Sequence, residues 1–444
     1  MKTTVLFSTL LAAVAVFAAA PTVSEVEVSQ AKNRDVTVSY LLSGGAAFVT
    51  AEILHGAEPV AVAVTNISGD VNGFVQPGRR SFVWKARKDW PDKKEAISAR
   101  VTAFPRGHMP DYMVVDLMNP NVRSWYATSN DVPGGVTSMV YKTDKLVMRR
   151  IPARNVIWRM GQPAGSELCQ GIANNESASG SALRNNETGH KVLLTEDFYM
   201  GIYEFTQRQY YNLTGLTPSA KKNGSSGNHY EGSKAWPVDS VSSDTLRGPT
   251  TASFPGWPQS GHAVAAESFL RTIRNFTGIE SFDLPTEAQW VFACRAGTST
   301  SLNSGKNVSD PTSGHGDASL AEVGWSQYNS SYDERAGNHP NEVGLLKPNA
   351  FGLYDMHGNV EERCLDWLTL GDNYRATFAP GWERGAVTVD PKGPETGSYR
   401  ILRGGDYFYS SCWMRSACRA ARAITPDSGT YHNGFRLVCA ATVE

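Results

Sequence analysis

The chain lacks the features that define several large protein classes. After one apolar run near its start, no hydrophobic stretch approaches the ~20 residues that span a bilayer, so we expect no membrane span. Its 42 basic and 43 acidic residues almost cancel, and no run of lysine or arginine forms the positive stripe of a nucleic-acid binder. It contains neither a zinc-ligand spacing nor a serine nucleophile elbow. These absences argue against a membrane channel, a nucleic-acid partner and the commonest hydrolases.

The first twenty residues have the pattern of an export signal. Lys2 precedes an apolar run over residues 5–17, and three alanines follow it. This run is too short for a membrane span, and small residues before a cleavage point are typical of secretory signal peptides. We expect a signal peptide over residues 1–20, cleaved after Ala18 or Ala19, and therefore a secreted or periplasmic protein.

Cysteine is also absent from the N-terminal third of the chain. The six cysteines all lie further on: Cys169, Cys294, Cys364, Cys412, Cys418 and Cys439. An exported protein meets an oxidising compartment, in which disulfides form and persist. We expect at least one disulfide in the C-terminal part, whereas the N-terminal part must fold without covalent links.

Short runs of alternating apolar residues fill the N-terminal third. Val36, Val38 and Tyr40 are one example, and glycine-rich turns separate one run from the next. A period of two is typical of antiparallel strands with one buried face. The sequence predicts a small immunoglobulin-like β-sandwich over residues 21–108. Residues 109–145 are expected to be a linker with short strands.

From residue 146 to the C-terminus, several particular motifs follow one another. They are Phe282-Asp283-Leu284-Pro285-Thr286-Glu287-Ala288-Gln289-Trp290, Gly352-Leu353-Tyr354-Asp355-Met356-His357-Gly358-Asn359-Val360, Arg403-Gly404-Gly405-Asp406-Tyr407 and Asn433-Gly434-Phe435-Arg436-Leu437-Val438. This set resembles the formylglycine-generating enzyme, or sulfatase-modifying factor, family. The resemblance implies an α+β fold class, with an irregular C-type-lectin-like domain over residues 146–444.

Three helices are expected in this domain. Thr206 is placed to cap the first, since its hydroxyl can accept from an unpaired backbone N–H. Apolar residues at helical spacing predict a second helix over residues 263–276. A third begins at residues 285–288, and Gly297 is expected to end it.

The resemblance implies an oxidase, but two residues on which its chemistry depends are different here. Enzymes of the family oxidise a sulfatase cysteine to formylglycine with molecular oxygen and a copper(I) ion held by two thiolates. Counting from the paired glycines, these two positions are occupied by Tyr409 and Met414. A phenol and one thioether do not replace a pair of soft anionic ligands. Copper, and with it oxidase activity, is therefore not expected at this place.

Two other cysteines lie close to the copper position. Cys412 and Cys418 would restore a dithiolate, and an active oxidase, if the loop slipped locally. Alternatively they are disulfide-bonded or buried thiols, which we favour in an exported domain. The resemblance also implies a disulfide between Cys294 and Cys439. The second of these lies two residues beyond the expected position, which preserves side-chain direction on a strand.

The resemblance further implies a structural calcium site. Its ligands are a side-chain oxygen of Asp355, the carbonyls of Gly358 and Val360, and the carboxylate of Glu362. Hard oxygen ligands on a tight turn suit calcium. A second family site should lie around residues 323–344, where the pattern is too different to assign ligands.

Three functional hypotheses follow. The first is the active oxidase with shifted thiols described above. The second is a non-oxidising relative whose groove around Asp406, Tyr409 and Met414 binds a sulfatase polypeptide, another peptide or a glycan. The third is an oxidoreductase with iron held by carboxylates and His357, although no other histidine stands at ligand spacing and a turn histidine is the better interpretation.

Overall fold

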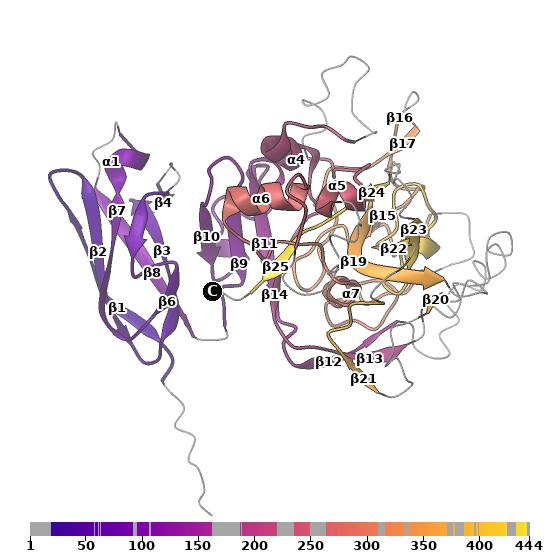
Figure 1. The fold of residues 1–444 in the computed structure, drawn as a ribbon, viewed down its shortest axis with the longest axis horizontal. Coiled ribbons are helices and arrows are strands. Elements are labelled where there is room, and N and C mark those ends of the chain that lie inside the picture. The colour runs from indigo at the N-terminus through magenta and orange to yellow at the C-terminus, as the bar shows by residue number, and fades with distance from the viewer. Residues whose placement is uncertain are drawn as a thin grey trace, which may run out of the picture. The chain divides into compact units, whose positions relative to one another are not determined.

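The computed structural model describes residues 19–441 with several gaps (Figure 1). The gaps are residues 57, 61, 63, 92–95, 106–107, 162–186, 188, 220–234, 249–262, 310–315, 334–336, 371–375, 378–385, 395–396, 398 and 424–431. The expected signal peptide falls almost entirely outside the described residues, and so does Cys169. Within the described part, no helix is long and apolar enough to cross a membrane.

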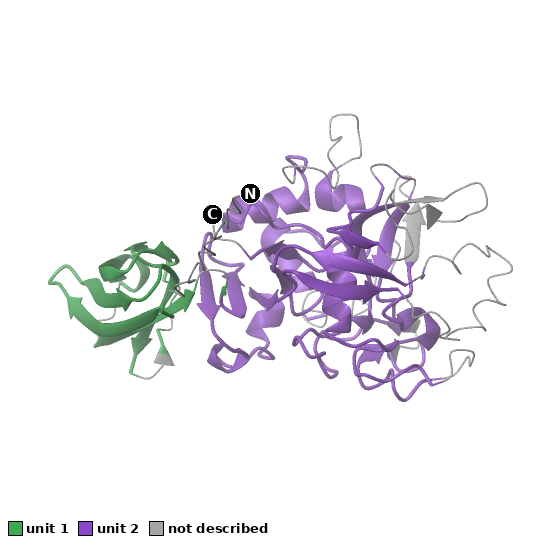
Figure 2. Cartoon of the chain, turned by 90° about the horizontal axis from the view of Figure 1, so that it is seen from below, with its two compact units in different colours: residues 1–109 green, residues 110–444 purple. Residues whose placement is uncertain are grey.

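The chain divides into two compact units, Met1–Met109 and Pro110–Glu444 (Figure 2). We expected residues 109–145 to be a linker with short strands. Short strands are present, β9 (Tyr112–Asp116) and β10 (Arg123–Tyr126), but the whole segment after Met109 is part of the second unit and not a separate linker. Tyr112 and the rest of β9 are buried, so apolar burial holds this segment against the sheet.

The first unit consists of two antiparallel sheets around one apolar core. One sheet has the order β1 (Thr22–Gln30), β2 (Asp35–Ser43), β7 (Gly78–Lys85), β5 (Ile67–Gly69). In the other, β3 (Ala47–His55) pairs with β4 (Glu58–Pro59), β6 (Gly73–Val75) and β8 (Ile97–Pro105), and a short helix α1 (Ala86–Asp89) follows β7. Val36, Val38 and Tyr40 alternate along β2 and are fully buried in this core, because their side chains all point to one face.

The second unit contains the other sheets, all of them small. One five-stranded sheet has the order β10, β9, β11 (Lys145–Ile151), β14 (Phe198–Gly201), β25 (Val438–Ala440). Another has the order β20 (Ala376–Thr377), β19 (Glu361–Leu370), β22 (Tyr399–Arg403), β23 (Ala420–Ala423), with β24 (Asn433–Gly434) also paired to β19. The remaining strands are β12 (Val156–Met160), β13 (His190–Leu194) and β21 (Val387–Val389) in one sheet, and two pairs, β15 (Gly324–Trp325) with β18 (His357–Gly358) and β16 (Ser331–Asp333) with β17 (Gly337–His339).

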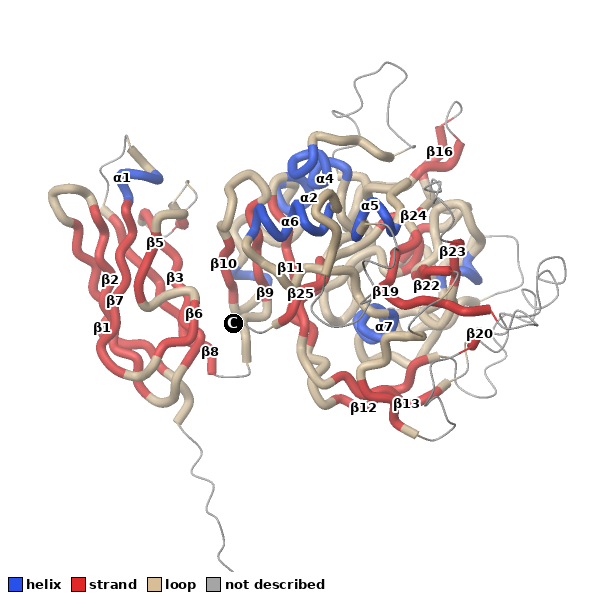
Figure 3. The backbone as a smooth tube through the Cα atoms, in the orientation of Figure 1, coloured by secondary structure: helices blue, strands red, loops and turns tan. Residues whose placement is uncertain are grey.

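Short helices and long loops complete this unit, as Figure 3 shows. The helices are α2 (Val140–Thr143), α4 (Gln207–Thr214), α5 (Ser243–Arg247), α6 (Phe269–Thr277) and α7 (Glu287–Arg295), with single 3-10 turns η1 (Ser129–Asp131) and η4 (Ser411–Met414). Mixed small sheets, few helices and much loop confirm the irregular α+β class.

The helix caps follow from the sequence. The hydroxyl of Thr206 accepts from the amide of Gln209, whose side chain accepts in turn from the Thr206 amide, which confirms the predicted cap of α4. Thr286 and Gln289 form the same box at the start of α7. This helix ends at Ala296 in the left-handed conformation, one residue before the glycine expected there.

A buried ion pair joins the C-terminal segment to the centre of the second unit. Arg436 and Glu362 are 0% and 1% exposed, and Arg436 Nη2 lies 2.7 Å from Glu362 Oε1. Trp290 of α7 donates its indole N–H to the same carboxylate over 2.7 Å. The remaining guanidinium hydrogens go to the carbonyls of Gly201, Ile202 and Tyr354. The Arg436–Glu362 pair therefore connects β14, β19, α7 and the segment between β24 and β25.

Replacing Glu362 by glutamine should strongly destabilise the second unit. The substitution keeps the shape but leaves the Arg436 charge buried without its counter-ion, which costs about 3–5 kcal/mol in comparable cases. Denaturant unfolding would measure this cost. The matched control is Glu280→Gln in the exposed pair with Arg271, where the expected loss is about 0–1 kcal/mol. Equal effects of the two substitutions would contradict the central role of the buried pair.

Candidate functional site

The loop after the paired glycines runs from residue 404 to η4. Gly404 and Gly405 have positive φ values of 95° and 72°, which favour glycine. A Cβ atom at Gly405 would also collide with the sulfur of Met414 and lie 2.9 Å from the Trp413 carbonyl. The close return of η4 onto the glycines therefore fixes where Tyr409 and Met414 lie.

Met414 occupies the inside of this loop. Its side chain is fully buried in an apolar cluster. The other buried members of the cluster are Leu302, Val308, Leu320 and Val323. A thioether surrounded by aliphatic side chains stabilises packing and offers no open coordination site. The residue at the second thiol position thus acts as a core residue.

Aromatic side chains lie on the outside of the same loop. We call Phe408, Tyr409, Trp413 and His432 the aromatic surface. Phe408 is 55% exposed and stacks on His432 with ring centroids 5.2 Å apart. Tyr409, at the first thiol position, packs at 5.7 Å against the partly buried ring of Trp413. The loop therefore presents ring faces and edges where the family's chemistry would need sulfur.

The groove expected from the sequence is only partly formed. Of its three residues, Asp406 and Met414 are fully buried, so they do not line an open groove. Asp406 turns inward because its Oδ1 accepts the backbone N–H of Phe408 over 2.7 Å, which closes a turn. Only Tyr409 keeps partial exposure. The prediction for Asp406 and Met414 is therefore corrected.

Buried ion pairs hold the loop in place at both ends. Glu287, the first residue of α7, accepts from Arg403 and from Arg419, with Arg419 Nε at 2.6 Å. These two guanidinium groups lower the pKa of Glu287 despite its burial. Within the loop, Arg415 forms a bidentate ion pair with Glu187, with Nη1–Oε2 and Nη2–Oε1 distances of 2.7 and 2.9 Å. Charges rather than covalent links thus anchor this part of the chain.

The two thiols near the copper position are both buried. The structure shows no disulfide at Cys412 or Cys418, and the sulfur of Cys412 lies 3.1 Å from the hydroxyl of Ser410. Burial raises the pKa of Cys418 well above its usual value, so this group is a protonated thiol at neutral pH. Copper(I) requires thiolates. A copper(I) dithiolate at these cysteines would therefore have to form from buried thiols that lose their protons on metal binding.

The disulfide expected between Cys294 and Cys439 is not present in the structure. Both residues are free, buried thiols with different neighbours. The Cys294 sulfur lies 3.7 Å from the Met356 carbonyl, whereas the Cys439 sulfur lies 4.0 Å from the sulfur of Met148. Burial raises the pKa of each thiol to about 12. A shift of two residues along β25 kept the side-chain direction but moved the sulfur to another part of the core.

His357 has a fixed tautomer. Its Nε2 accepts the backbone N–H of Asn303 over 2.9 Å, so Nδ1 carries the proton and donates to the Met414 carbonyl over 2.6 Å. Burial lowers the pKa of this imidazole to about 4. Both ring nitrogens are engaged, which argues against iron ligation and supports the interpretation as a turn histidine.

The expected calcium ligands lie in a buried acidic region. Asp355 is buried, and burial raises its pKa to about 6. Its Oδ2 accepts from the Gly344 amide. Oδ1 forms no hydrogen bond of good geometry among the described residues, although the Trp325 side chain lies close enough to this carboxylate to lower its pKa as a donor. Glu362 differs, because Arg436 and Trp290 occupy both its oxygens. In this arrangement, the carboxylate of Asp355 could therefore coordinate a cation, whereas that of Glu362 could not. No cluster of three metal-binding side chains occurs among the described residues.

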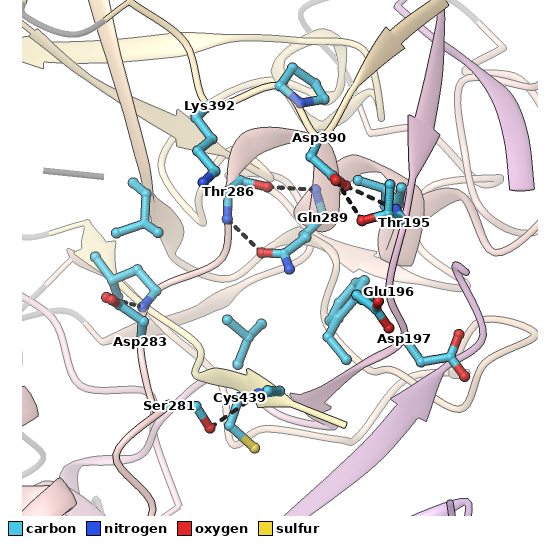
Figure 4. Close-up of a pocket in the computed structure, with 17 residues that line it drawn as sticks. Thr195, Glu196, Asp197, Ser281, Asp283, Thr286, Gln289, Asp390, Lys392 and Cys439 are labelled. Atoms are coloured by element: carbon cyan, nitrogen blue, oxygen red, sulfur yellow. Dashed lines mark hydrogen bonds between the residues drawn. The ribbon is translucent and has the colours of Figure 1, made fainter. Parts of the chain in front are cut away.

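A pocket of about 400 Å³ lies beside the start of α7 (Figure 4). Its polar side chains are used within the protein. Asp390 accepts from the amide and hydroxyl of Thr195, and Asp283 pairs with Arg247. The capping box of α7 also faces it, and Cys439 lies at its edge. This pocket is explained by the packing of the strand ends around α7.

Comparison with known proteins agrees with the motifs and the fold. The model of the sulfatase-modifying factor enzyme 1-like domain matches residues 163–441, well over half of the chain. The chain belongs to this family. The matched region contains the aromatic surface and all four anchoring ion pairs of the second unit described above.

Relatives in the family include named enzymes. The formylglycine-generating enzyme of Thermomonospora curvata is 35% identical over 159 residues, which are 36% of this chain and 48% of that protein. The one from Bos taurus is 29% identical over 281 residues, covering 58% of this chain and 69% of that protein. This chain thus spans about half the length of the first of these relatives.

A solved structure is also similar. Variable protein 1 of Treponema denticola aligns with a TM-score of 0.43 and 23% identity, covering 67% of this chain and 95% of that protein. At this level of similarity, the likeness carries no conclusion about function.

Proposed function

We propose that this chain is an exported, non-oxidising member of the sulfatase-modifying factor family that binds a peptide or glycan at its aromatic surface. The observation that carries the proposal is the environment of Met414. A fully buried thioether inside an aliphatic cluster stands where a copper thiolate is needed, and its partner Tyr409 packs on Trp413. Copper therefore has no fitting ligand pair here.

Two features of the aromatic surface favour binding. Phe408 exposes more than half of its side chain and lies beside other aromatic rings, so several ring surfaces are available together to one ligand. Its ring is held by stacking on His432, so little conformational entropy is lost on contact. A polypeptide is suggested by the family of modifying enzymes, and a glycan by the exposed ring face.

The alternative of an active oxidase with shifted thiols has less support. Cys418 lies in a turn closed by the Arg415 carbonyl, and its own carbonyl accepts from Arg403 over 2.7 Å. Moving it into the position of Met414 would break these bonds and displace two buried arginines. That cost is comparable to several buried charge-assisted hydrogen bonds.

We further propose structural calcium at Asp355. Burial is the largest cause of the raised pKa of Glu204. The carboxylates of Asp355 and Glu362 lie close enough to raise it further. Arg436 supplies the one cation paired with this group among the described residues. A divalent cation at Asp355 and the carbonyls of Gly358 and Val360 would compensate the remaining charge.

Copper binding separates the non-oxidising proposal from its alternative. We expect no high-affinity copper(I) binding in competition with a chelator, and no formylglycine in a sulfatase-derived cysteine peptide under oxygen. Tyr409→Cys with Met414→Cys should increase copper(I) affinity at least 100-fold, because it supplies two soft ligands in register. Ser410→Cys with Trp413→Cys is the control that adds thiols out of register. Turnover by the unmodified protein, lost on Cys412→Ser or Cys418→Ser, would refute the proposal.

Ligand binding tests the role of the aromatic surface. Calorimetry with a serine-substituted sulfatase peptide and with neutral oligosaccharides should identify one class that binds. Phe408→Ala should weaken that binding at least tenfold, because it removes the most exposed ring. Its melting temperature should stay close to that of the parent, as for the control Leu345→Ala at an exposed position away from the loop. Unchanged affinity in Phe408→Ala, or no binding of either class, would contradict this role.

Calcium should stabilise the second unit. A ligand that binds only the folded state adds about 2.7 kcal/mol at 100 times its Kd, which corresponds to a rise of a few degrees in melting temperature. Asp355 has a positive φ of 55°, so Asp355→Asn is the suitable variant, since asparagine tolerates this conformation. We expect it to reduce the calcium-dependent rise. The same melting temperature in millimolar calcium and in chelator would argue against the site.

A further inference from the structure

A second cavity lies between β12 and the C-terminal end of α7, which are neighbours in Figure 1. Its volume is about 430 Å³, within the range of small-molecule sites. The lining residues are Pro152, Val156, Trp158, Arg159, Gly161, Phe292, Arg295, Gly297, Thr298, Ser299 and Phe351. None of them belongs to the aromatic surface or to the copper loop.

Three aromatic rings form one part of the wall of this cavity. Trp158 meets Phe292 edge to face with centroids 5.4 Å apart, and Phe292 contacts Phe351 at 5.9 Å. Trp158 comes from β12, Phe292 from α7 and Phe351 from the loop before β18, so three separate segments hold the rings. Such a wall is rigid and favours an apolar ligand body.

One buried charge faces this apolar wall. Arg295 is only 5% exposed. Its Nη2 donates to the Gly161 carbonyl over 2.9 Å and its Nη1 to the Thr300 carbonyl over 3.2 Å, while Nε has no partner among the described residues. Burial lowers the pKa of this guanidinium. Backbone carbonyls and the helix end compensate the charge only in part.

Arg295 differs in this respect from most of the other buried arginines of the unit, although Arg363 and Arg400 likewise donate to backbone carbonyls. Six of them form an ion pair with a carboxylate: Arg247, Arg274, Arg403, Arg415, Arg419 and Arg436. Among the described residues, no carboxylate forms an ion pair with Arg295 and none lines the cavity. A second arginine, Arg159, lies at its exposed side. The lining thus carries two positive charges and no negative one.

We propose that this cavity binds a small carboxylate with an apolar body, the carboxylate facing Arg295 and the body lying among the three rings. A guanidinium binds a planar carboxylate through paired N–H donors, and a buried site strengthens this contact. Phosphate esters fit less well, because the apolar wall would leave most of their oxygens without donors. Two kinds of ligand carry a carboxylate on an apolar body: a free aromatic or aliphatic acid, and the C-terminal residue of a peptide.

The test uses the full-length protein and matched pairs of probes. Calorimetry should show binding of 3-phenylpropionate at millimolar concentration or tighter, and at least tenfold weaker binding of the uncharged 3-phenylpropan-1-ol. The peptide Gly-Gly-Phe with a free C-terminus, compared with its amide, separates the two sources. Binding of the free-acid peptide with the affinity of 3-phenylpropionate assigns the site to chain termini, and binding of the small acid alone assigns it to free acids.

Variants separate the charge from the wall. Arg295→Gln should bring the acid and the alcohol to the same affinity, and Trp158→Ala should weaken both at least fivefold. Ile157→Ala is the control, because Ile157 is 60% exposed on the same strand and does not line the cavity. If Arg295→Gln fails to fold, the Trp158→Ala variant and the comparison of acid with alcohol in the parent protein still test the proposal. Equal affinity for acid and alcohol in the parent protein, no acid binding at 10 mM, or unchanged binding in Trp158→Ala would overturn the proposal.

Discussion

The second unit depends on the buried pair of Arg436 and Glu362. A guanidinium and a carboxylate without access to water are stable only when every hydrogen and lone pair is used, and here Trp290 and three backbone carbonyls complete the set. These partners come from distant parts of the chain, so the pair forms only when the tertiary fold is complete. In a domain with few helices and small sheets, this requirement selects one arrangement of many loops.

The ion pairs also explain how the loop after the paired glycines keeps its place. Glu287 holds Arg403 before the paired glycines and Arg419 after η4, so the ends of the loop are fixed by charge. The interior of the loop needs no charge of its own, because Met414 is held there by apolar contacts. Charge at the ends and apolar packing inside therefore position this loop together.

Local sequence rules predicted the elements well and the side-chain environments poorly. The caps of α4 and α7 follow from hydroxyl and amide side chains three residues apart, which is a local property. The burial of Asp406 and the separation of Cys294 from Cys439 depend on how loops pack, which spacing along the chain does not encode. Arg295 was missed for the same reason, because its carbonyl partners and its place in a cavity wall depend on how distant segments pack.

The contrast between these arginines bears on where function lies in the molecule. A buried charge is tolerated at a cost, and in this unit most such charges are neutralised by an acid that also serves the fold. Arg295 contributes two hydrogen bonds to carbonyls, yet keeps its charge against an aromatic wall. A leucine or methionine of similar length would pack against Trp158 and Phe292 without that cost. The cost is physically reasonable if the charge meets a ligand, and the cavity beside it has the size and polarity for one.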